Sequence, residues 1–201
     1  MRYDTEEFEE RLKRMRVDKQ LAFGSCLAER ALPMYLAFQA DTTHIGSSEV
    51  LAAYASIWRA LETGQWETAC FLETSDCEIM MPDSEDYHSF YTSAAMDAVA
   101  LLCSLLDFIT HRDTTSIAEA IRLQIDTIDL AAQRLIGEYD VDENDALVSG
   151  PTSMLSQERS RMYSDLDFLE SIDGDSVKIA IAVRSRICML DYRSTRLIRL
   201  P

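Results

Sequence analysis

The chain has 201 residues, of which 47% are hydrophobic and 27% charged, a composition typical of one globular domain with a buried core. Its 35 Asp and Glu outnumber 19 Lys and Arg, so the formal net charge is −16, which argues against non-specific nucleic-acid binding because phosphate contacts need clustered cations. Six Gly and four Pro are too few for a collagen-like or Pro/Gly-rich disordered chain or a many-turned β-sandwich.

Apolar residues recur at helical spacing, and we expect a single all-α domain of seven to eight helices. Asp4 can cap the first helix, with Glu7 as its capping-box partner. The second helix opens at Asp18 and contains Pro33, so we expect a kink or break near residues 29–31.

A third helix is predicted from Ser48 to Gly64, since Gly suits the position after a helix. A fourth is expected over residues 67–80. A loop over residues 83–86 then leads into a long apolar helix from about Tyr87 to His111.

The next helix begins at Thr114 or Thr115 and repeats isoleucines at three- and four-residue steps. A polar linker over residues 141–152, with room for a short helix near 143–147, separates residues 1–140 from a C-terminal helical pair in 153–201. A strand over 177–183 is the alternative for the last helix, but the length and flanks of this run favour a helix.

We expect a cytoplasmic protein. The first ten residues lack the apolar run of a secretory signal, and the longest apolar stretches fall short of the roughly 20 residues of a membrane span. The five Cys are an odd number without a CxxC pair, which argues against disulfides and zinc.

Charge is unevenly distributed along the chain. Residues 65–113 hold ten acidic residues and one basic one, whereas residues 177–201 hold one acidic and six basic residues. Helical i,i+4 pairs cannot neutralise the acidic stretch, so its partner is the basic last helix, another molecule or counter-ions. If the last helix leaves it uncovered, a negative surface remains that attracts a basic partner.

Polar residues within apolar helices form a second candidate feature. Glu29 and Arg30 lie in the second helix and Asp97 in the helix over 87–111. Because a lone buried charge is costly, we expect a buried polar network, with Arg30 paired to Asp97 as one arrangement. A polar pocket and simple exposure are the alternatives.

Known catalytic patterns are absent from the sequence. It has no G-x-S-x-G, P-loop or G-x-G-x-x-G motif, and one Glu-x-x-His spacing, Glu85 to His88, where a di-iron bundle needs two. The sequence therefore predicts no catalytic residue, no metal and no cofactor.

A family resemblance lies in residues 21–35, LAFGSCLAERALPMY. This stretch resembles the signature F-x-x-C-L-x-E-R-x-x-P-x-Y of the YjaG-like bacterial family, a domain of unknown function. Trp58, Pro82 and the run Tyr91-x3-Ala95-x-Asp97-Ala98 follow in the same order, so the resemblance covers most of residues 10–140. It implies an all-α cytoplasmic domain and no activity.

Taken together, these features favour an acidic protein-binding module, most concretely an immunity protein that neutralises a basic, nuclease-type toxin. The predicted contact residues are acidic or aromatic: Asp76, Glu78, Asp83, Glu85, Asp86, Tyr87 and Tyr91. An enzyme or a small-ligand or metal-binding bundle, using Glu29, Arg30 and Asp97 or Glu85 and His88, is one alternative. A structural homodimer is another.

Overall fold

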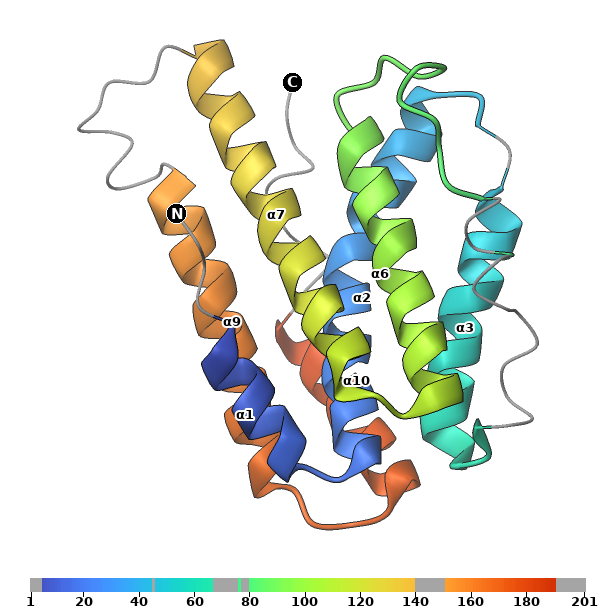
Figure 1. The fold of residues 1–201 in the computed structure, drawn as a ribbon, viewed down its shortest axis with the longest axis vertical. Coiled ribbons are helices and arrows are strands. Elements are labelled where there is room, and N and C mark those ends of the chain that lie inside the picture. Colours follow the sequence, from blue (N-terminus) through green and yellow to red (C-terminus); the bar gives the residue numbers. More distant parts are fainter. Residues whose placement is uncertain (1–4, 45, 67–75, 77–79, 140–150, 191–201) are drawn as a thin grey trace.

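The computed structural model describes residues 5–44, 46–66, 76, 80–139 and 151–190. Within these ranges the chain is helical and contains no strand, which confirms the predicted all-α class (Figure 1). The helices are α1 (Glu6–Arg14), α2 (Val17–Asp41), α3 (Ser47–Thr63), α6 (Thr92–His111), α7 (Thr114–Tyr139), α9 (Pro151–Ser171) and α10 (Ser176–Leu190).

Helix α2 is the centre of the bundle. It packs against α3, α6, α7, α9 and α10, and every residue from 20 to 31 is buried. A helix that is apolar on all sides belongs in the core of a protein, which explains why the stretch shows no polar face. The C-terminal pair α9 and α10 thus joins the same bundle as the earlier helices.

Pro33 lies inside α2, and of the kink or break expected near residues 29–31, no break occurs. The helix continues from Val17 to Asp41 as one element. Proline removes one backbone hydrogen bond and crowds the preceding turn. Here the packing of buried residues on both sides of Pro33 holds the two halves of the helix together.

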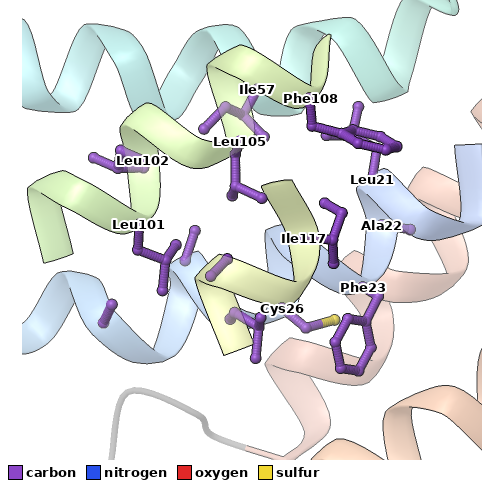
Figure 2. Close-up of a cluster of buried hydrophobic side chains, with 14 of the residues drawn as sticks. Leu21, Ala22, Phe23, Cys26, Ile57, Leu101, Leu102, Leu105, Phe108 and Ile117 are labelled. Atoms are coloured by element: carbon purple, nitrogen blue, oxygen red, sulfur yellow. The ribbon is translucent and has the colours of Figure 1, made fainter. Parts of the chain in front are cut away.

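Close packing in the core depends on Gly24 of α2. A Cβ atom there would lie 2.4 Å from Leu105 Cδ2 and 3.2 Å from Ile117 Cδ1, which belong to α6 and α7. Figure 2 shows the surrounding side chains, with Leu105 and Ile117 directed toward the α2 residues. A larger residue at position 24 would therefore require the Leu105 side chain to move.

Two helix ends confirm sequence predictions. Gly64 follows α3 with φ 65° and donates its N–H to the carbonyl of Ala60 at 3.0 Å, as expected of a glycine cap. Helix α7 begins at Thr114, after a short turn in which Arg112 adopts φ 60°.

The start of α6 differs from the prediction. The helix begins at Thr92, five residues after the expected Tyr87. The carbonyl of Asp83 accepts the N–H groups of Asp86 and Tyr87, and the Thr92 hydroxyl donates to the carbonyl of Tyr87. These bonds fix a turn in place of the first helical turns.

Several predictions lie outside the described residues. These are the cap at Asp4, most of the helix over 67–80 and nearly all of the linker. The run 177–183 is helical, within α10, so the strand alternative is wrong.

Among the helices that the structure describes, only α6 is long and apolar enough to cross a membrane by length and composition. Of its most apolar window, 67% is buried within the bundle, as in the core helix of a soluble protein.

Candidate functional site

The exposed acidic residues Asp83, Glu85 and Asp86 lie in a tight turn before α6, which we call the acidic loop. Pro82, which is buried, fixes the entry to the turn. The Asp83 carboxylate accepts the backbone N–H of Glu85 at 2.8 Å, a local bond typical of aspartate in turns. The turn therefore holds the Glu85 and Asp86 side chains at the surface.

The segment after the acidic loop is anchored to the end of α2. Ser89 donates to the Asp41 carboxylate at 2.5 Å and accepts the N–H of Tyr91 at 3.1 Å. The ring of Tyr87 meets Phe38 and His44 edge-on, with centroids 5.4 and 5.2 Å apart. These contacts tie the loop to the bundle.

The two predicted aromatic contact residues are half-buried. Both Tyr87 and Tyr91 pack against the hydrophobic core, and the Tyr91 ring contacts Phe90. Their rings thus position the loop. What the loop presents to solvent is its carboxylates.

No ion pair joins Asp83, Glu85 or Asp86 to any cation in the part of the chain that the structure describes. Of the other predicted acidic contacts, Asp76 is half-buried and Glu78 lies outside the described residues. The structure thus places three of the five predicted acidic residues together at the surface.

The second candidate feature is a buried charge cluster around Arg30. Its Nε donates to Glu158 at 2.7 Å, and its Nη1 donates to Asp165 at 2.7 Å. All three side chains are at most 3% exposed. Both carboxylates come from α9, so the cluster joins α9 to the central helix.

The cluster extends to two further helices. Arg186 of α10 approaches Asp165 at 3.3 Å, and Gln124 of α7 donates to Glu158 at 3.3 Å. The cavity beside Arg30 and Gln124 measures about 10 Å³, room for about one water molecule. The cluster is therefore a filled structural core, too tight for a small organic ligand.

The predicted pairing of Arg30 with Asp97 is wrong. Asp97 accepts a hydrogen bond from Thr127 at 2.7 Å, while Arg30 points to α9. Burial raises the pKa of Asp97, and the Thr127 hydrogen bond only partly offsets this. Asp97 therefore joins α6 to α7, whereas Arg30 joins α2 to α9.

Glu29 of α2 faces α3. Tyr54 of α3 has a raised pKa because its hydroxyl is buried and because the Glu29 carboxylate is nearby. Arg184 of α10 covers this region, with its guanidinium 4.2 Å from the ring centroid of Trp58 and its Nε 2.5 Å from Glu62. Glu29 and Arg30 therefore belong to two separate polar contacts, one with α3 and the other with α9.

The described arginines of α10 do not cover the acidic loop. Arg184 pairs with Glu62 of α3, and Arg186 with Asp165 of α9. The further basic residues of the C-terminal segment, Arg193, Arg196 and Arg199, lie outside the described residues.

The candidate metal ligands and the thiols can be placed within the described residues. They contain no group of three or more His, Cys, Asp or Glu arranged to hold a metal, and Glu85 and His88 are both exposed. Cys26 and Cys103 are buried and Cys188 is exposed, and burial raises the pKa of Cys26.

Sequence reasoning missed Glu158, Asp165, Gln124 and Arg186. The sequence does contain a signal for the two acids. Glu158 and Asp165 share the buried face of α9 with Met162, Leu166 and Leu169. Acids at core positions of an amphipathic helix predict a buried cationic partner. They do not say that the partner is Arg30, 128 residues earlier.

Comparison with known proteins places the chain in a family. A family model described as "Protein of unknown function (DUF416)" matches residues 7–188. The chain belongs to the DUF416 family. The match extends past residue 140 to include α9 and most of α10, and with it the acids that pair with Arg30.

A solved structure supports the fold. The crystal structure of a DUF416 family protein from Shewanella baltica OS155 aligns with a TM-score of 0.71 and 22% sequence identity, over 91% of this chain and 94% of that one. At this identity the likeness shows the fold alone. No curated protein matches the chain.

Proposed function

We propose that this DUF416 protein is an acidic protein-binding module that docks a basic partner protein on the acidic loop. The observation that carries the proposal is the exposure of Asp83, Glu85 and Asp86 on an anchored turn, without an ion pair among the described residues. Because these carboxylates are exposed and unpaired among the described residues, their negative electrostatic field can attract a cationic partner.

Two physical features support this function. The formal net charge of −16 steers a cationic protein toward the chain and raises the association rate. The bonds of Ser89 and the packing of Tyr87 pre-form the loop, so that binding costs little ordering entropy.

The most concrete form of this function is an immunity protein that occupies the phosphate-binding surface of a nuclease-type toxin. Such a surface is cationic because it holds nucleic acid. The proposal includes a bacterial, cytoplasmic setting, in keeping with the YjaG-like resemblance of residues 10–140 and with the Shewanella structure. A nuclease-toxin gene adjacent to this one would be the expected genomic context.

Capture from the host tests the proposal. Wild-type protein and the triple variant D83K/E85K/D86K are used as bait, and captured proteins are identified by mass spectrometry. We expect a basic protein with the wild type and its loss with the variant. The variant E10K/D126K/D173K changes three exposed acids elsewhere by the same charge and is expected to retain the partner. Equal capture by both triple variants would contradict the loop as the docking site.

A further inference from the structure

His44, between α2 and α3, contacts the chain on both sides of the acidic loop. Its Nε2 lies 3.1 Å from the carbonyl oxygen of Met80, and its ring meets the Tyr87 ring edge-on with centroids 5.2 Å apart. Met80 lies three residues before Asp83, and Tyr87 directly follows Asp86. One imidazole therefore connects the two ends of the acidic loop.

The imidazole is itself held in place. Gln39 of α2 donates to the backbone carbonyl of His44 at 3.3 Å, and the centroid of the Phe38 ring lies 5.4 Å from that of the imidazole. A Cβ atom at Gly46 would lie 3.3 Å from Nε2 of His44 and 3.8 Å from the Cβ of Met80. Glycine at this position therefore leaves room for the imidazole to reach the Met80 carbonyl.

These two contacts hold the loop without using its carboxylates. A carbonyl oxygen only accepts, so the bond to Met80 requires the hydrogen on Nε2 of His44. The contact with Tyr87 is between two rings. Holding both ends of a short loop removes conformations that the loop would otherwise lose on binding, and it leaves the carboxylates to face a partner.

We propose that His44 is a positioning residue, which sets the geometry in which the carboxylates of the acidic loop meet a basic partner. The inference rests on the proposed function, because it is the carboxylates that would touch the partner. A loop released at both ends keeps its charge and loses its fixed geometry. Partner binding then falls although the formal net charge stays at −16.

Amide hydrogen exchange of the full chain, followed by NMR, tests whether His44 holds the loop. The N–H groups of Asp86 and Tyr87 donate to the carbonyl of Asp83 and report opening of the loop, while the amides of α6 report opening of the bundle. We expect His44→Ala to raise the exchange rates of Asp86 and Tyr87 about tenfold and to leave those of α6 unchanged. His88→Ala, at an exposed histidine next to Tyr87, is the matched control and leaves the loop rates unchanged.

A conservative variant separates the hydrogen bond from the ring. His44→Gln keeps a side-chain N–H donor and is expected to restore part of the protection that His44→Ala loses. In the capture experiment, His44→Ala is expected to retain less of the basic protein than wild type does, and His44→Gln to retain more than His44→Ala.

Three results overturn the proposal: unchanged loop exchange in His44→Ala, an equal rise in the exchange of α6, or full capture despite faster loop exchange. If the wild type captures no basic protein, the proposed function fails, and the exchange rates of the free protein alone decide whether His44 holds the loop.

Discussion

The buried charge cluster and the acidic loop use carboxylate side chains in opposite ways. Around Arg30, two carboxylates are withdrawn from water and matched by a guanidinium at 2.7 Å. In the acidic loop, three carboxylates stay in water without an ion pair among the described residues. The first set joins helices distant in sequence, and the second leaves the charge available to another molecule.

The comparison shows that burial, rather than residue type, separates the carboxylates committed to the fold from those that the proposed function uses. A buried carboxylate without its partner is costly, so Glu158 and Asp165 are committed to the fold. An exposed one contributes little to stability, so Asp83, Glu85 and Asp86 are free to serve another purpose.

The largest expected effect is the loss of stability when the buried charge cluster loses its central cation. Arg30→Met leaves Glu158 and Asp165 buried without their main cation, and we expect a loss of about 3–5 kcal/mol in the free energy of unfolding. Urea denaturation measures it. Arg14→Met, at a side chain that is 79% exposed, is the control and should cost about 0–1 kcal/mol. Similar losses in both variants would show that Arg30 has no special role.

The same cluster can be removed as a whole. In R30M/E158L/D165L no buried charge is left unmatched at these three positions, and Arg186 and Arg161 are 20% and 41% exposed, so both can reach water. We expect the triple variant to recover about 3 kcal/mol or more of the loss caused by Arg30→Met. A triple variant less stable than the single one would mean that the ion pairs themselves stabilise the fold.

Asp97 is half-buried, so its exposure lies between that of the buried charge cluster and that of the acidic loop. The pH dependence of the free energy of unfolding at this residue therefore tests the effect of burial on a carboxylate. Burial raises its pKa above the ordinary value near 3.8. A carboxyl whose pKa rises on folding contributes stability that is present below the ordinary pKa and is lost as the pH rises through the raised one.

Asp97→Asn removes the ionisable carboxyl group and with it the pH-dependent loss of stability. The asparagine still has an oxygen that can accept the Thr127 hydrogen bond. Relative to wild type, the variant should therefore gain stability as the pH rises from acidic to neutral. Urea denaturation over that pH range measures the difference. A constant difference would show that folding leaves the pKa of Asp97 unchanged.

The smallest effect on stability is expected in the acidic loop. D83N/E85Q/D86N keeps the side-chain oxygen at position 83 that accepts the N–H of residue 85. Each change should alter the free energy of unfolding by no more than about 0.5 kcal/mol, since the sites are exposed. Thermal denaturation checks this. A large loss would assign the loop carboxylates to the fold.

Local patterns predicted much of the fold. The isoleucine spacing and Thr114 located α7, and Gly64 located the end of α3. The start of α6 was misplaced because the side-chain bonds of Asp83, Ser89 and Thr92 favour turns over helix, and helical periodicity does not register them.

The partner of Arg30 could not be predicted from spacing. The sequence showed that a charge in the middle of α2 needs a counter-charge, and Asp97 offered one within another apolar helix. The actual partners lie 128 and 135 residues away, on a helix whose position depends on the packing of the whole bundle. The acidic loop was predictable because its exposure follows from a local turn.

The proposed function requires that the acidic loop carries a charge available to a basic partner protein. Isothermal titration of the captured partner with D83N/E85Q/D86N tests it most directly, with E10Q/D126N/D173N as the control of equal charge. We expect the Kd to rise about a hundredfold or more for the loop variant, since charged pairs at an interface contribute several kcal/mol together, and to change little for the control. An unchanged Kd for the loop variant would contradict it.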